Sequence, residues 1–187
     1  MSCDLGAGRA VPCLNAVGGI RTVYVGNYKD IPVQAGFAVD ASDATEIDTL
    51  ATAAQTFYTF NLRKEMASLT INIATDPASG TTYHESSLSL TFNNFTPADL
   101  DKFVTLAQGR PNVFVHDNND NIWLLGARDG VEMSTGSGAT GQGFGDANGF
   151  TIELTAKDNV LYHGAKTAGV TTANYPFDNV SGVTVSA

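Results

Sequence analysis

Several segments of this sequence alternate apolar and polar side chains at every second residue, and only one segment has clear helical spacing. The first alternating segment runs from Ile20 to Val25 and ends at Gly26-Asn27. Such alternation is typical of strands with one buried face. We therefore expect a mostly β protein, with a second, shorter strand from Val33 to Val39.

The longest β-prone stretch is residues 57–73, and a polar loop at 76–82 separates it from residues 83–92. Leu88, Leu90 and Phe92 share one face of the second segment. We expect the two segments to form a long antiparallel β-ribbon. Its many Thr, Ser and Asn residues exceed what a core sheet needs, and such a ribbon is marginally stable unless it lies against something else.

The helix is expected at 96–108. Thr96 is a suitable N-cap, Pro97 occupies the first helical position, and Asp99 and Asp101 lie at the positive end of the helix dipole. The predicted buried stripe, at helical spacing, is Leu100, Phe103, Val104 and Ala107, and Gly109 ends the helix.

Residues 42–54 fit two interpretations. Ile47, Leu50, Ala51 and Ala54 have helical spacing, and Asp43 with Glu46 could cap a first turn. The same residues are rich in Thr and Ala and also fit a strand followed by a loop, which is the interpretation we favour.

The clearest hairpin is residues 111–126, with its turn at Asn118-Asn119-Asp120. A glycine-rich stretch covers 131–149, and 149–158 is a strong strand. The predicted fold is an antiparallel β-sandwich or barrel with one flanking helix. We divide the chain into a β domain at 1–163, whose residues 1–19 form an extended arm, and an extended C-terminal segment at 164–187 to which the sequence assigns no role.

The charge balance argues against nucleic-acid binding through phosphates. The chain has 19 acidic and 10 basic residues among 187, a net charge of −9, whereas phosphate binding needs a basic surface. One reading is a solubilising acidic surface, and the other is a surface that lies close to DNA without adhering to it. Five acids and no base lie between Lys29 and Arg63, namely Asp30, Asp40, Asp43, Glu46 and Asp48.

Neither membrane insertion nor export is expected. The longest apolar runs are about six residues, far short of a membrane-spanning helix. Asp4 and two glycines stand where a secretory signal would have basic and then apolar residues. Cys3 and Cys13 lie too near the terminus to staple a core, and we expect both to be reduced and inert.

Two motifs resemble ligand sites. GSGATG at 136–141 matches a dinucleotide-binding pattern, but a strand and not a helix is expected next, which favours a connector or a small-residue strand. DNNDN at 117–121 offers oxygen ligands at calcium-loop spacing. Because Ile122 and Arg128 replace the glycine and the glutamate that a calcium loop needs, a hairpin turn is the better interpretation.

No residue is predicted to be catalytic. His84, His116 and His163 lie on separate segments with no nucleophile motif, and each is interpreted as structural. Trp123 fits hairpin packing. We therefore expect no enzyme activity, no cofactor and no metal site.

The chain resembles tail tube proteins of tailed bacteriophages. The resemblance rests on GRAVPCLNAVGGI (8–20), on the helix followed by GRPNVFVHDNNDNIWLLG (109–126), and on TGQGFGDANGFTIELTAKD (140–158), and it runs over most of residues 8–158.

This resemblance implies a virion structural protein in which six copies close into a ring and the rings stack into a tube. The ribbon of 57–92 would line the channel and contact neighbouring rings, with 96–108 packed outside it. Partners would be further copies and other tail proteins (sheath, tape measure, baseplate, terminator), with DNA passing through without adhering. The protein would lie in the virion tail after assembly in the host cytoplasm, away from membranes.

Two other classes of function are open. Another virion or surface β-module, such as a capsid decoration or an adhesin domain, would be a trimer or monomer with affinity for a ligand or glycan. A small hydrolase would need clustered His and Asp or Glu side chains.

Overall fold

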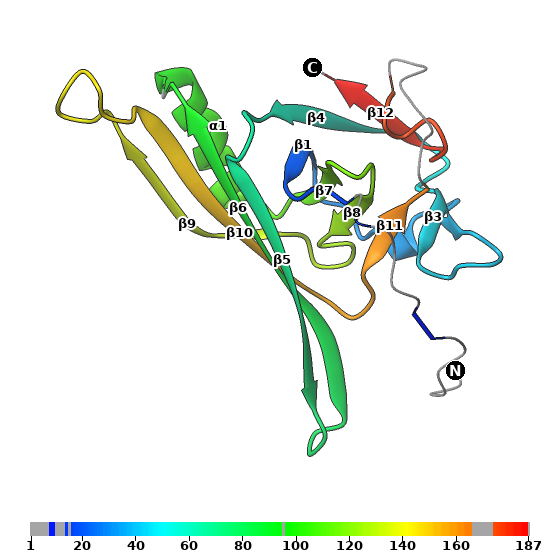
Figure 1. Cartoon of the computed structure of the whole chain (residues 1–187). Coiled ribbons are helices and arrows are strands. Elements are labelled where there is room, and N and C mark those ends of the chain that lie inside the picture. The colour runs from blue at the N-terminus through cyan, green and yellow to red at the C-terminus, as the bar shows by residue number, and fades with distance from the viewer. Residues whose placement is uncertain (1–7, 10–13, 15, 95, 166–173, 187) are drawn as a thin grey trace.

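The protein is a two-sheet β-sandwich with one flanking helix (Figure 1), seen in a computed structural model that describes residues 8–9, 14, 16–94, 96–165 and 174–186. Sheet A has the strand order β12-β4-β1-β7-β8-β11-β3-β2, and sheet B has the order β5-β6-β10-β9. Neither sheet closes into a barrel. The predicted arm at 1–19, with Cys3 and Cys13, lies mostly outside the described residues.

Among the described residues, eight strands form sheet A and four form sheet B. Sheet A contains β1 (Ile20–Gly26), β2 (Ala38–Val39), β3 (Glu46–Thr49), β4 (Gln55–Asn61), β7 (Asn112–Asp117), β8 (Ile122–Leu125), β11 (Tyr162–Gly164) and β12 (Val183–Ser186). Sheet B contains β5 (Ala67–Asp76), β6 (Thr81–Asn93), β9 (Glu132–Ala139) and β10 (Gly149–Asp158). The helices are η1, a 3₁₀ turn at Ile31–Val33, and α1 at Pro97–Gln108.

Sheet A is buried on both faces because its central strands carry apolar residues on both sides. Val23 of β1 lies opposite Val115 of β7, and both belong to a core shared with sheet B and α1. Tyr24 lies opposite Phe114 and packs on the other side, in a second core that includes Phe177. The near-continuous apolar run of β7 reflects this double burial.

Helix α1 begins as predicted, but only part of the predicted stripe is buried. The Thr96 hydroxyl accepts a hydrogen bond from the backbone N–H of Asp99, and Pro97 is the first helical residue. Phe103 is buried as predicted, and Leu106, which was not part of the predicted stripe, is buried as well. Leu100 and Val104, predicted to be buried, are 41% and 45% exposed, because the ring of Phe103 stacks on Phe150 of sheet B and so sets the rotation of the helix.

The predicted ribbon is correct for β5 and β6, which pair antiparallel from Ala67–Leu90 to Asp76–Thr81. It is wrong for residues 57–61, because β4 pairs with β1 in sheet A. The chain changes sheets at residues 62–66, where Glu65 has a positive φ of 64°. Alternation alone does not reveal this change, since both sides of the turn keep the same period.

The short strand predicted at Val33–Val39 is mostly wrong. Pro32 lies at the start of η1, Gly36 has a φ of 87°, and only Ala38–Val39 is strand. The favoured interpretation of 42–54 is correct, because β3 is a strand followed by a loop. Asp43 does not cap a helix there; its carboxylate accepts hydrogen bonds from Thr45.

The hairpin at 111–126 is confirmed as β7 and β8, and the strand at 149–158 is confirmed as β10. In the C-terminal segment, β12 pairs parallel to β4, and Phe177 packs against Phe114 and Tyr24. Within the described part of the chain, no helix has both the length and the apolar character needed to span a membrane.

Candidate assembly surface

Sheet B has one apolar face and one polar face. Leu88 and Leu90 of β6 and Ile152 and Leu154 of β10 point into the core shared with sheet A. The side chains between them point outward, and the strand register places their partners on the same side. We call these outward residues the polar face: Ser68, Thr70, Asn72, Glu85, Ser87, Ser89, Thr91, Glu132, Thr135, Ser137, Thr151, Glu153, Thr155 and Lys157.

Hydrogen bonds join the strands across the polar face. Glu153 accepts from the Ser87 hydroxyl on β6 (3.1 Å) and from the Thr135 hydroxyl on β9 (3.4 Å). Lys157 forms an ion pair with Glu85 at 3.2 Å, and hydrogen bonding to Glu85 raises the pKa of Lys157. The ionised residues of this face are thus three glutamates and one lysine, which gives it a modest negative charge among neutral hydroxyls.

The two edges of sheet B are β5 and β9. Among the described residues neither has a strand partner on its outer side, and β9 is exposed along nearly its whole length. Its sequence from Glu132 to Ala139 consists largely of small residues. An open edge of this kind offers unpaired backbone N–H and C=O groups to another strand.

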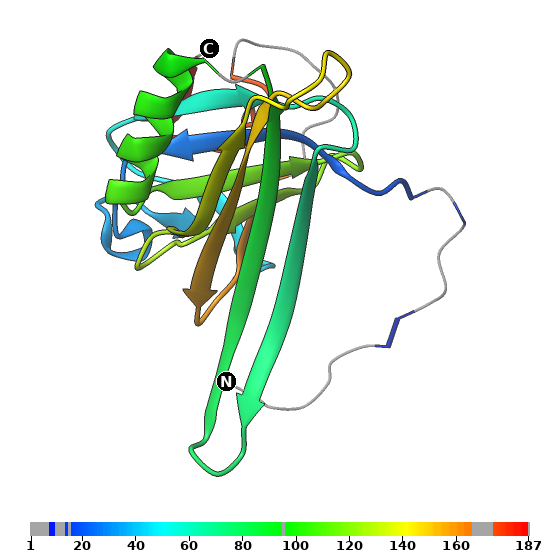
Figure 2. The same ribbon diagram turned by 90° about the vertical axis from the view of Figure 1, so that its left-hand side faces the viewer.

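The hairpin of β5 and β6 projects beyond the rest of the sandwich (Figures 1 and 2). Its base is covered, since Leu69 packs against the core. Toward the tip, Ile73 lies on the same side of β5 as Leu69 but is 68% exposed. The projecting part therefore presents an uncovered apolar side chain that the described residues do not bury.

A groove of about 730 Å³ runs beside α1. Tyr58 and Phe60 of β4, Phe92 of β6 and Phe103 of α1 contribute to its lining. Together with the exposed Leu100 and Val104 it leaves apolar surface near the helix.

The two motifs that resemble ligand sites have structural roles. Residues 136–139 lie in β9 and no helix follows them, which confirms the small-residue strand. At 117–121, one oxygen of Asp117 accepts from the backbone N–H groups of Asn119 and Asn121, both at 2.8 Å. The hairpin-turn interpretation of this segment is thereby confirmed.

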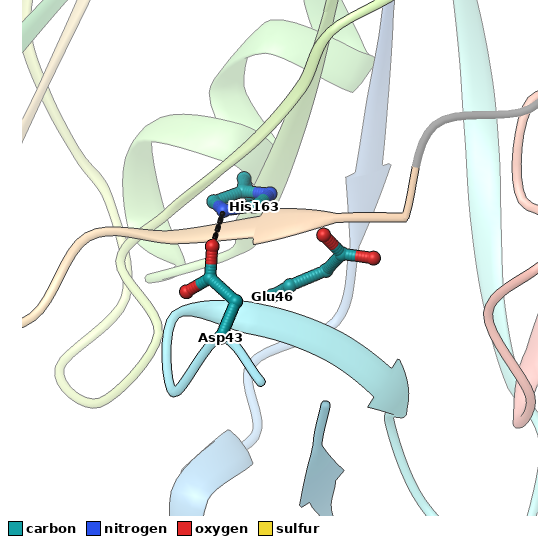
Figure 3. A group of neighbouring side chains, drawn as sticks. All are labelled: Asp43, Glu46 and His163. Carbon is teal, nitrogen blue, oxygen red and sulfur yellow. Dashed lines mark ion pairs between the residues drawn. The ribbon is translucent and has the colours of Figure 1, made fainter. Parts of the chain in front are cut away.

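The three histidines lie apart, and two of them meet a carboxylate. His116 is buried, and its Nε2 lies 3.1 Å from Asp120. His163 Nε2 lies 3.5 Å from Asp43, with Glu46 beside them (Figure 3). His84 is half-buried in β6, and its Nδ1 has no hydrogen-bond partner among the described residues. The grouping of Asp43, Glu46 and His163 was not predicted from the sequence. The grouping depends on the pairing of β3 with β11, which are far apart in the chain.

The acidic stretch from Asp30 to Asp48 lies away from the polar face. It covers η1, β2 and β3, and β2 and β3 form one end of sheet A. The charge of the polar face therefore comes from other residues.

No protein-family model and no curated protein matches the chain. A solved structure described as "Virion of native gene transfer agent (GTA) particle" is similar to it, with a TM-score of 0.39 and 11% sequence identity over 57% of this chain and 89% of that chain. Similarity at this level does not establish a shared fold or function.

Proposed function

We propose that this chain is a structural protein of a virion, without catalytic activity, whose copies close into rings of six that stack into a tail tube for phage DNA. The resemblance noted in the sequence motivates the proposal. The observation that carries it is sheet B, which has two open edges and a polar outer face. A monomer would leave both edges exposed to non-specific pairing.

Strand direction supports a ring closed through these edges. Each strand of sheet B is antiparallel to its neighbour, so β5 and β9 run in opposite directions. Rotation about a ring axis preserves strand direction along that axis. The β9 strand of one copy would therefore meet the β5 strand of the next in the antiparallel sense, through a head-to-tail contact that closes as a ring.

The polar face would then line the channel. Its hydroxyl and amide side chains offer little apolar surface to DNA bases, and the ring of Tyr83 on the same side of β6 lies beside Lys157, whose Nζ is 5.6 Å from the ring centroid. Glu85, Glu132 and Glu153 outnumber the single Lys157, so DNA phosphates would be repelled weakly. The projecting β5–β6 hairpin would reach the neighbouring ring, and α1 would lie outside the barrel. Other tail proteins would cap or surround the tube in the virion after assembly in the host cytoplasm.

Charge reversal across the joint tests the ring. Thr70 on β5 and Ser137 on β9 are both exposed polar-face residues on opposite edges of the sheet. Lysines at both positions (Thr70→Lys with Ser137→Lys) would put like charges on the two strands that meet at every joint of a ring, while they lie on opposite edges of the sheet in one chain. The matched pair Thr70→Asp with Ser137→Lys would put opposite charges on these two strands instead.

Light scattering after size-exclusion chromatography gives the readout. We expect the wild type and the Asp/Lys pair to form particles of six times the 19.6 kDa chain mass, or stacks of these, and the Lys/Lys pair to remain smaller. A wild type that stays monomeric at high concentration, or forms trimers, would refute the ring and favour a decoration or adhesin module.

A further inference from the structure

Three side chains with metal-binding atoms meet at the β3–β11 contact, outside the assembly surface. β11 pairs parallel to β3 with His163 opposite Glu46, so these two side chains leave the sheet on the same side. The backbone N–H of His163 also donates to the carbonyl of Thr45 at 2.9 Å. Asp43, in the loop before β3, completes the group (Figure 3).

The carboxylate of Asp43 is already oriented toward His163. Its Oδ1 accepts from the hydroxyl of Thr45 at 2.7 Å and from the backbone N–H of Thr45 at 2.9 Å. The hydrogen bonds from the Thr45 side chain and backbone lower the pKa of Asp43. Its Oδ2 is left 3.5 Å from His163 Nε2, close to the separation of about 3.3 Å between two ligands of one tetrahedral zinc ion.

Glu46 supplies a third ligand atom. The ligand atoms of the three residues all lie within 4.8 Å of one another. Among the described residues, no lysine or arginine forms an ion pair with Asp43 or Glu46. Two carboxylates without a cationic partner beside an imidazole suit a divalent cation.

A shallow hollow next to the group leaves room for water on an ion. Glu46 and His163 line it together with Trp123 of β8. A site with three protein ligands and open water positions is therefore sterically possible.

We propose that Asp43, Glu46 and His163 bind a divalent transition-metal ion of the zinc class. The imidazole favours Zn²⁺, Co²⁺ or Ni²⁺ over Mg²⁺ and Ca²⁺, which prefer oxygen ligands alone. The bound ion links β3 to β11 and so stabilises the β2–β3 end of sheet A. This inference departs from the expectation of no metal site and does not rest on ring formation.

The test uses untagged protein and two probes. Calorimetric titration with zinc chloride is expected to give one saturable site per chain, and zinc is expected to raise the melting temperature. Titration with Co²⁺ is expected to quench the fluorescence of Trp123, the single tryptophan, whose ring centroid lies 6.3 Å from that of His163.

Matched variants identify the ligands. We expect His163→Gln, Asp43→Asn and Glu46→Gln each to weaken zinc binding by about tenfold or more. The control Asp40→Asn removes a carboxylate in the same loop that makes a similar turn with Ser42, and His84→Gln removes a histidine elsewhere. Both controls should bind zinc as the wild type does. Absence of saturable binding at millimolar zinc, or wild-type affinity in the three ligand variants, would overturn the proposal.

Discussion

Asp158 is a buried carboxylate that organises the loop after β8. It is 3% exposed, and its two oxygens accept from the backbone N–H groups of Gly126 and Ala127 at 2.9 and 3.0 Å. Burial raises the pKa of Asp158 although these hydrogen bonds oppose the shift. The two hydrogen bonds offset part of the desolvation cost of burying this carboxylate.

Replacing Asp158 should destabilise the fold strongly. Asp158→Ala leaves two buried N–H groups without acceptors, and we expect a loss of about 2–4 kcal/mol in the free energy of unfolding. Urea denaturation measures this loss. The control Asp129→Ala, at an exposed position nearby, should change stability by less than about 0.5 kcal/mol. Equal effects of the two substitutions would show that the Asp158 hydrogen bonds contribute little.

His116 makes the stability depend on pH. Its Nε2 lies next to Asp120, and its buried Nδ1 has no hydrogen-bond partner among the described residues. A proton on Nδ1 would therefore be buried without an acceptor. Burial lowers the pKa of His116, and the hydrogen bond to Asp120 opposes the shift only in part.

Because the folded chain binds this proton less tightly than the unfolded chain, the free energy of unfolding should fall as the pH drops below about 6.5. His116→Gln removes this titration and keeps a donor for Asp120. Urea denaturation between pH 5 and 7.5 is expected to give a shallower pH dependence for the variant. Parallel curves for variant and wild type would contradict this role of His116.

Helix α1 is the element in which sequence periodicity gave the right bounds but only part of the buried face, since Phe103 is buried and Leu100 and Val104 are not. The cap at Thr96 and the proline at position 97 are local signals and are read directly from the sequence. The rotation of the helix depends on the contact of Phe103 with Phe150, 47 residues later along the chain (150 − 103), at a centroid distance of 4.6 Å. Local spacing contains no information about that partner.

Substitutions on the two sides of α1 test this rotation. Phe103→Ala should cost about 3–5 kcal/mol, because it removes a buried ring stacked on Phe150. Val104→Ala, at a half-exposed position, should cost less than about 1 kcal/mol. Thermal or urea unfolding of both variants gives the comparison. A large loss of unfolding free energy in Val104→Ala would show that Val104 is buried, as the spacing predicted.

Other errors of the sequence analysis have the same origin. The alternation of 57–61 identifies a strand correctly, but whether it pairs with β1 or with β6 depends on the turn around Glu65. The meeting of Asp43 and Glu46 with His163 depends on a parallel pairing of distant segments. The hairpin of β7 and β8, whose partners are adjacent in the chain, is predicted fully.

The β5–β6 hairpin is expected to act in contacts between copies. Ile73 is 68% exposed near its tip, so Ile73→Ser should leave the stability of the single chain within about 0.5 kcal/mol. If the hairpin reaches a neighbouring ring, the variant should need a higher protein concentration to form stacks, because apolar burial is lost. Sedimentation velocity over a concentration series measures this.

Asn72→Ser provides the control. Asn72 is the chain neighbour of Ile73 but points to the polar face. We expect the Asn72→Ser variant to form stacks at the same protein concentration as the wild type. Stacking of Ile73→Ser at wild-type concentrations would argue against a role of the hairpin tip.

At the scale of the whole molecule, the two sheets have different surroundings. Sheet A is covered on both faces by the chain itself, through two separate cores. Sheet B is covered on one face only, and its other face is polar. The polar outer face of sheet B is the surface that the proposed ring would use.

Electron cryomicroscopy of the purified protein at high concentration tests the ring most directly. We predict rings of six copies, single or stacked, in which β9 of one copy pairs with β5 of the next and the polar face of sheet B lines the channel. Particles that remain monomeric, or rings in which the polar face points outward, would contradict the account.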